Sequence, residues 1–159
     1  MIQRIQSIYL LVAAIAAVVL MCIPIGWFST AEYGYVYTAF VVKDVTPDAG
    51  VLMSTAYLGI LLAISVIFSL ISIFLYKNRN QQIKMIYANM FIFLLSITLM
   101  LFVYPDMVFA KSGLIKDSKE IDYNFVIILC MVITAGMLYL ANRSIKNDEK
   151  KVKAADRLR

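Results

Sequence analysis

The ionisable side chains that could do chemistry are concentrated at the end of the sequence. The stretch after Asn142 carries seven basic and three acidic residues, a net charge of +4. Basic side chains near a bilayer attract anionic lipid headgroups by about 1 kcal/mol each, and they also bind acidic protein or RNA surfaces. No aromatic side chain interrupts these charges, so we expect no sequence-specific reading of nucleic acid and no DNA partner. The residues expected to contact an anionic partner are Lys150, Lys151, Lys153, Arg157 and Arg159.

Carboxylates in the loops are the other groups that could act on a substrate. Asp106 and Asp122 could serve as general bases in a lipid-modifying enzyme at a membrane face. Asp117 and Glu120 resemble a capping box ahead of a helix. Helix capping and solvation are the simpler interpretation of these acidic residues.

Most familiar catalytic and metal-binding arrangements are excluded. The sequence has no histidine, which removes His-ligated haem, His-ligated zinc and His-dependent nucleophiles. It also lacks a Cys-x-x-Cys pair, a Gly-rich phosphate loop and a Gly-x-Ser-x-Gly motif. Cys22 and Cys130 fall in apolar stretches where thiols are mostly inert, although a bridge between them is geometrically open. We therefore expect no catalytic residue, no cofactor and no metal.

The composition is that of a membrane protein. Of 159 residues, 62% are apolar and 16% are charged, with a mean hydropathy of +0.83, whereas soluble domains carry about 25% charged residues. Four uncharged stretches are long enough to cross a hydrocarbon core of about 30 Å as helices, because backbone amides in lipid must be paired internally. The predicted spans are 6–25, 49–76, 84–104 and 122–142, with outer loops 26–48 and 105–121 and a basic helical tail 143–159.

Local signals predict where the helices begin and end. Thr46-Pro47-Asp48 is typical of a helix start, so the second helix is expected to begin near Pro47 and to end near Lys77. Pro105 is expected to end the third helix. Asn147 is a candidate N-cap for a separate helix in the tail.

The distribution of basic residues predicts the orientation. Eleven of the fifteen lie at the N-terminus, in the link 77–84 or in the tail, and such residues stay on the cytoplasmic side. Both termini are therefore expected in the cytoplasm. An alternative for the first segment is a cleaved signal peptide, with a possible cleavage site at 29–31. The apolar run 8–25 is longer than is usual for one, so a retained helix is the preferred interpretation.

The first outer loop predicts a small β-sheet. Residues Tyr33 to Val42 are dense in aromatic and β-branched types, and 26–30 could pair with them across a turn. Met107–Phe109 could add a third strand. A lone hairpin is marginal in water, so the sheet is expected to rest on the outer helix ends. The candidate contact surface for a partner or lipid comprises Trp27, Tyr33, Tyr35 and Tyr37, although tyrosines on one face are also what a packed sheet needs.

Apart from Lys84 and Asp122 at their first positions, the spans carry no ionisable side chain other than tyrosine and cysteine. Proton relays and ion pathways normally place a charged group there. Among the small polar residues, Asn89 is the first to test, and a hydrogen bond between helices is the preferred interpretation. Small residues four apart, or adjacent on the last helix, predict close packing within the chain; they are Ala13 with Ala17, Gly59 with Ala63, Ser65 with Ser69, and Ala135 with Gly136.

Both ends of the chain carry a family resemblance. The opening Met-Ile-Gln-Arg-Ile-Gln-Ser-Ile-Tyr-Leu-Leu and the closing Asp-Glu-Lys-Lys-Val-Lys-Ala-Ala-Asp-Arg-Leu-Arg, with four spans between them, resemble a family of small inner-membrane proteins of Bacteroidota known only as a domain of unknown function. The resemblance implies a bacterial inner-membrane protein and no particular activity. Trp27 and the strand-rich first loop are also similar in outline to claudin-like proteins, without the Cys pair of their first loop, so this likeness is an architectural analogy.

Together these features predict an all-α membrane protein, a four-transmembrane-helix bundle with a small β-sheet formed by the outer loops. The expected function is a non-enzymatic accessory or scaffold subunit whose partners are membrane lipids and other membrane protein subunits. A small transporter or channel for an apolar or lipid-like substrate is the alternative, and the lipid-modifying enzyme is the third hypothesis.

Overall fold

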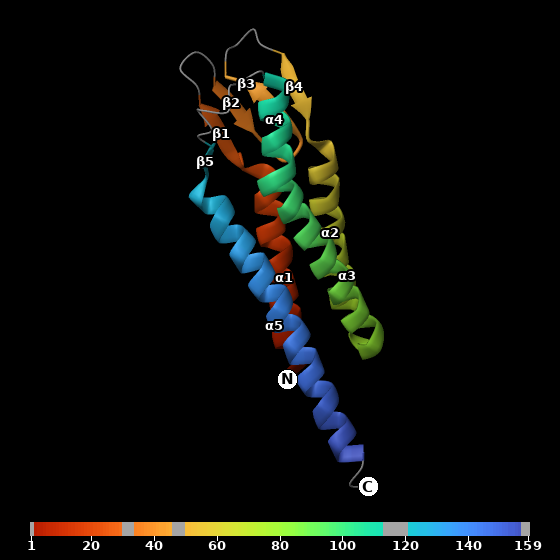
Figure 1. Cartoon of the computed structure of the whole chain (residues 1–159). Helices are drawn as coiled ribbons and strands as arrows, with labels where there is room; N and C mark the ends of the chain where they lie inside the picture. Colours follow the sequence, from red (N-terminus) through yellow and green to blue (C-terminus); the bar gives the residue numbers. More distant parts are fainter. Residues whose placement is uncertain (1, 30–33, 46–49, 113–120, 157–159) are drawn as a thin grey trace.

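Four long apolar helices dominate the fold (Figure 1). The computed structural model describes residues 2–29, 34–45, 50–112 and 121–156. Each of the four helical stretches is long and apolar enough to cross a membrane. The helices are α1 (Ile2–Cys22), α2 (Ala56–Phe74), α3 (Arg79–Thr98), α4 (Tyr104–Ser112) and α5 (Phe125–Asp156). Helix α1 contacts α2 and α5, and α3 contacts α2 and α5, while a small sheet covers one end (Figure 1). The prediction of a mostly helical chain with a small antiparallel sheet is confirmed.

Helix α2 begins later than predicted. Its first residue is Ala56 rather than a residue near Pro47, and Thr46–Asp48 lie outside the described residues. The intervening strand β4 (Val51–Ser54) pairs with the sheet and buries Met53 beneath it. The apolar run 51–54 suits either structure locally, and strand pairing decides the outcome. A 3-10 turn, Leu75–Lys77, follows α2, so the helical stretch ends at Lys77 as predicted.

Pro105 does not end the third span. A π-helical segment, Leu99–Val103, joins α3 to α4, so the helical path continues to Ser112. Pro105 is the second residue of α4, a position where proline is tolerated although it removes one backbone N–H donor. The wider turn shifts the bonding pattern, since the Tyr104 N–H bonds to the carbonyl of Leu99, five residues back.

Helix α5 is one uninterrupted helix of 32 residues. Asn124 caps it, because the Asn124 Oδ1 accepts the Val126 N–H at 3.0 Å. Asp117 and Glu120, the predicted capping box, lie outside the described residues, and the strand β5 (Ile121–Tyr123) precedes the helix. The predicted separate helix starting at Asn147 is wrong, since α5 passes through this position without a break.

The sheet has five antiparallel strands in the order β4-β3-β2-β1-β5. The new strands are β1 (Gly26–Ser29), β2 (Gly34–Tyr37) and β3 (Val41–Asp44). The predicted pairing of β1 with the following segment is confirmed. The predicted continuous strand 33–42 is broken at Thr38, whose hydroxyl accepts the Val41 N–H at 3.1 Å and stabilises a turn. Met107–Phe109 are helical in α4, and β5 forms the edge instead.

The small residues predicted to allow close helix packing differ in their surroundings. Ala13 and Ala17 are fully buried in α1. Gly59 admits the ring of Phe40, because a Cβ at position 59 would lie 2.3 Å from the Phe40 Cε1. Ala135 and Gly136 are exposed, and a Cβ on Gly136 would meet nothing within 4 Å. The predicted packing by this last pair is wrong, because α5 turns Thr134, Leu138 and Ala141 inward instead.

Candidate functional site

One row of residues crosses the exposed face of the sheet. Cross-strand pairing aligns Asp122 with Trp27, Trp27 with Val36, Val36 with Lys43, and Lys43 with Val51. Directly opposed residues point to the same face of a sheet. Trp27 is 39% exposed and Val51 is 59% exposed. We call these five residues the outer row; it presents an apolar centre between an acidic and a basic side chain.

The predicted contact surface is therefore divided between two faces. Trp27 lies in the outer row, whereas Tyr35 and Tyr37 alternate with Val36 and point to the other face. Tyr37 is fully buried, so it belongs to the core rather than to a contact surface. Tyr33 lies outside the described residues. The strand register, which pairs Trp27 with Val36, is the physical reason for this correction.

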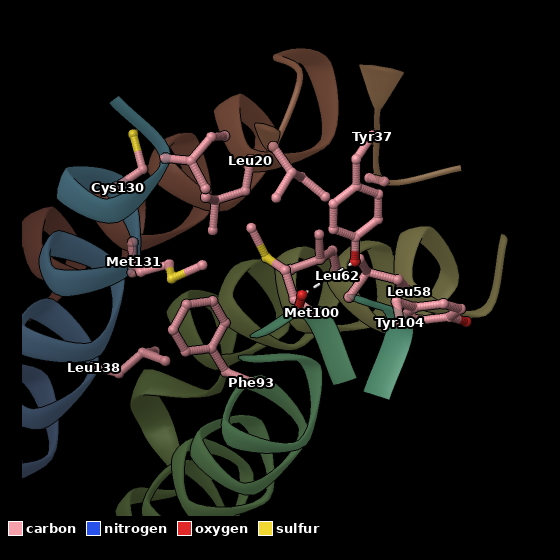
Figure 2. Packing of buried hydrophobic residues seen from close by; sticks show 14 of the residues in the cluster. Leu20, Tyr37, Leu58, Leu62, Phe93, Met100, Tyr104, Cys130, Met131 and Leu138 are labelled. Carbon is pink, nitrogen blue, oxygen red and sulfur yellow. Dashed lines mark hydrogen bonds between the residues drawn. The ribbon is translucent and has the colours of Figure 1, made fainter. Parts of the chain in front are cut away.

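Two tyrosines connect the sheet to the proline in the third span. An α-helical residue 105 would donate its N–H to the Leu101 carbonyl, and a π-helical one would donate to the Met100 carbonyl, but Pro105 has no N–H. The Tyr37 hydroxyl donates to the Met100 carbonyl at 3.3 Å (Figure 2). The Tyr123 hydroxyl donates to the Leu101 carbonyl at 3.4 Å. The sheet thus supplies a side-chain donor to each of the two carbonyls that the missing N–H could have served.

These phenols remain donors over the usual pH range. Burial raises the pKa of the Tyr37 phenol. Burial, with the nearby carboxylate of Asp106, also raises the pKa of the Tyr123 phenol. Asp106 has further interactions of its own, and Asp122 is exposed in the outer row, so these two carboxylates occupy different surroundings.

The basic end of α5 extends past the other helices (Figure 1). Lys150 is exposed; Lys151 and Lys153 lie on the backbone of α5, whereas Arg157 and Arg159 lie outside the described residues. Gln6 of α1 donates its Nε2–H to the Asp148 carboxylate, which fixes α5 beside the start of α1. The helical backbone therefore carries the basic segment away from the bundle as far as residue 156.

A buried polar seam joins α2 to α3. The Ser65 hydroxyl donates to the Asn89 Oδ1 at 2.7 Å, and the Asn89 Nδ2 donates to the Ser69 Oγ at 2.8 Å. Further along, the Gln82 Nε2 donates to the Ser72 carbonyl at 2.9 Å. All five side chains are buried. The predicted helix-to-helix hydrogen bond of Asn89 is confirmed.

Gln82 is the member of this seam that the sequence reasoning missed. Its signal was available, because Gln82, Asn89 and Ser96 are spaced seven apart and therefore share one face of a helix. On α2 the serines 65, 69 and 72 follow the matching spacing of four and three. Two polar stripes on consecutive helices indicate a shared interface.

Replacing Asn89 with alanine is expected to lower the free energy of unfolding by about 1–2 kcal/mol, because two hydrogen bonds and the amide volume are lost in an interior without water. Denaturant unfolding of the purified protein in detergent measures the change. Thr98→Ala is the matched control, since the Thr98 hydroxyl is exposed and bonds only its own helix, at the Leu94 carbonyl. Equal effects of the two variants would contradict the seam's role.

The described part of the chain offers little for metal or thiol chemistry. Among the described residues, no three His, Cys, Asp or Glu side chains gather in a possible metal site. Cys22 and Cys130 are both free, the first exposed and the second buried. Inside the spans, the Asn89 amide bonds Ser65 and Ser69 on the neighbouring helix. The hydroxyls of Ser96 and Thr134 donate to carbonyls of their own helices.

These features define a small protein of four helices of membrane-spanning length with a five-stranded sheet at one end. The sheet and the basic end of α5 lie at opposite ends of the molecule (Figure 1). The chain belongs to the family described as domain of unknown function DUF4293, which it matches over residues 2–158. A search of curated proteins finds no match to the chain.

Proposed function

We propose that the protein is a non-enzymatic accessory or scaffold subunit of a membrane protein assembly. The observation that carries this proposal is the continuity of α5. This helix begins directly after β5, which contributes Asp122 to the outer row, and reaches the basic segment without a break. At about 1.5 Å per residue its 32 residues span about 48 Å, against about 30 Å of hydrocarbon, so its end projects into water. One rigid element thus joins two exposed surfaces.

The proposed setting is the bacterial inner membrane, crossed four times, with both termini in the cytoplasm. Lys84, Lys146 and Lys150 are exposed at the end of the bundle opposite the sheet. The excess of basic residues at that end supports a cytoplasmic location. The outer row then faces the periplasm, where it contacts another subunit, while the basic segment contacts anionic lipid, an acidic protein surface or RNA.

The polar seam supports a structural rather than a catalytic interior. Asn89 uses its amide oxygen and nitrogen on Ser65 and Ser69, so these groups hold α2 against α3. Such interhelical bonds are typical of packing interfaces in membrane proteins. A scaffold subunit requires a stable bundle of this kind.

The test replaces Lys150, Lys151, Lys153, Arg157 and Arg159 with glutamine. Neutralising five charges is expected to reduce co-purification of the cytoplasmic partner at least tenfold and to remove its salt sensitivity, since each charge contributes about 1 kcal/mol near an acidic surface. Quantitative mass spectrometry after gentle extraction measures the loss, and nuclease treatment separates an RNA partner from a protein. Glutamine at Lys111, Lys116 and Lys119 is the control. Unchanged, salt-sensitive co-purification by the first variant would refute the proposal.

A second candidate, transport of an apolar or lipid-like substrate, is favoured by an apolar groove between α3 and α5, lined by residues such as Leu94 and Leu138. Flux of a labelled lipid across reconstituted vesicles distinguishes the two functions, because a scaffold shows none.

A further inference from the structure

The side chains that line the groove between α3 and α5 are all apolar. Its volume is about 250 Å³, and its walls include Met90, Leu94 and Ile97 from α3 with Ala135 and Leu138 from α5. Ala135 is exposed and small, which keeps the groove open on the α5 side. Compact metabolites occupy pockets of about 300–1,000 Å³ that enclose most of their surface. A smaller groove, open along one side and set among residues of two spans, suits a single hydrocarbon chain.

Polar side chains lie one or two helical turns beyond the groove, toward the end of the bundle opposite the sheet. Tyr87 lies one turn before Met90 and Phe91 on α3, while Asn142 and Lys146 lie one and two turns after Leu138 on α5. The Lys146 ammonium donates to the Tyr87 hydroxyl and lies 4.8 Å from the centre of the Tyr87 ring. These contacts bridge the two helices where the apolar groove ends.

Asn142 adds a buried acceptor to this end. The residue is 7% exposed, and its side chain lies within hydrogen-bonding reach of the Tyr87 hydroxyl. Its Oδ1 atom, however, has no hydrogen-bond partner among the described residues. A buried amide oxygen left without a donor costs about 1–3 kcal/mol. The atom is enclosed by protein, so this acceptor lies behind the rim of the groove rather than on its surface.

The charge around this polar end is positive. Lys84 lies one turn before Tyr87, and Lys150 lies one turn after Lys146, both exposed. Of the two nearby carboxylates, Asp148 is bonded by Gln6 from α1, and Glu149 has interactions of its own. An anionic group beside Lys146 is therefore favoured by three lysines on facing helices.

We propose that this groove is a binding site for one molecule of anionic phospholipid. One acyl chain lies along the apolar walls between α3 and α5, and the phosphate pairs with the Lys146 ammonium. The apolar walls and the positive rim together match the hydrocarbon chain and the anionic phosphate of a lipid. This site does not depend on the scaffold role.

The test is native mass spectrometry of the full chain released from nanodiscs that contain equal amounts of phosphatidylglycerol and phosphatidylcholine. The wild type is expected to retain phosphatidylglycerol about tenfold more than phosphatidylcholine. Lys146→Gln should lower this preference about fivefold, because one headgroup charge contact is lost. Ala135→Phe should reduce retention of both lipids at least fivefold by filling the groove.

Matched controls keep the outcome specific. Lys111→Gln removes the same charge from α4, and Ala88→Phe adds the same bulk at an exposed position of α3 that does not line the groove. Neither control should change lipid retention. The site would be refuted by equal retention of the two lipids, by controls that match the test variants, or by a second protein chain bound in place of lipid.

Discussion

Tyr37→Ala is expected to lower the free energy of unfolding by about 3–5 kcal/mol, the range measured for deleting a buried aromatic side chain. Tyr37 is fully buried, and its ring centre lies 5.9 Å from that of Phe28 and 6.5 Å from that of Tyr104. Figure 2 shows Tyr37 and Tyr104 in this cluster. The substitution empties the junction between the sheet and the third span. Thermal or denaturant unfolding in detergent measures the loss. Tyr35→Ala is the matched control, since Tyr35 lies on the same strand and face but is only half-buried.

Tyr37→Phe separates the hydroxyl from the ring. This variant is expected to cost about 1–2 kcal/mol, because the Met100 carbonyl loses its buried donor. In a Pro105→Ala background the restored N–H can serve the carbonyls of Met100 or Leu101, so the same change should cost clearly less. An undiminished cost in that background would contradict the proposed compensation between the proline and the tyrosines.

The pH dependence follows from the same residue. Burial raises the pKa of Tyr37 in the folded state, whereas the unfolded chain releases the phenolic proton near pH 10. Above this pH the unfolded state binds fewer protons than the folded state, so stability falls as pH rises further. Tyr37→Phe should flatten this part of the stability profile.

Gly26→Ala is expected to destabilise the protein by about 1–3 kcal/mol through overpacking between β1 and β5. A Cβ at position 26 would lie 2.8 Å from the Asp122 carbonyl oxygen and 3.4 Å from the Tyr123 Cα, both backbone atoms. Strand β5 must therefore move, and the start of α5 with it, because the Asn124 N–H donates to the Ile25 carbonyl at 3.0 Å. The change is measured as a fall in unfolding free energy.

Gly136→Ala is the control for this prediction. Position 136 is helical and open, so the added methyl group meets nothing and should stabilise the protein by about 0.5–1 kcal/mol through helix propensity. The close contact at Gly26 would be disproved if both alanine variants raised the stability alike.

Much of the fold was readable from the sequence. Uncharged stretches longer than the hydrocarbon thickness predicted four helices, because only regular internal hydrogen bonding suits such segments in lipid. Asn89 was singled out as a polar residue inside a span, and its bond across to α2 was expected for the same reason. The pairing of β1 with β2 followed from aromatic and β-branched residues on both sides of a short turn.

The predictions that were wrong concern segments whose local sequence suits more than one structure. Residues 51–54 are apolar enough for a helix, yet pairing with β3 makes them a strand. Met107–Phe109 could be a strand by composition, but the π-helical turn before Pro105 lets the helix continue through them. Asn147 can cap a helix, but α5 is already helical when it reaches this position. In each case a non-local or cumulative interaction outweighs a local preference.

The sequence by itself determined that four helices form and which end of the chain is basic, because chain length, hydropathy and charge act locally and need no neighbours. Only the tertiary structure decided which face of the sheet is exposed, since the register that sets Trp27 against Val36 buries Tyr37. It also decided that the Tyr37 and Tyr123 hydroxyls serve the carbonyls that a residue 105 N–H could have served, and that Asn142 and Lys146 of α5 meet Tyr87 of α3. Hydrogen bonds between residues 22 to 63 positions apart are set by packing, which no local pattern encodes.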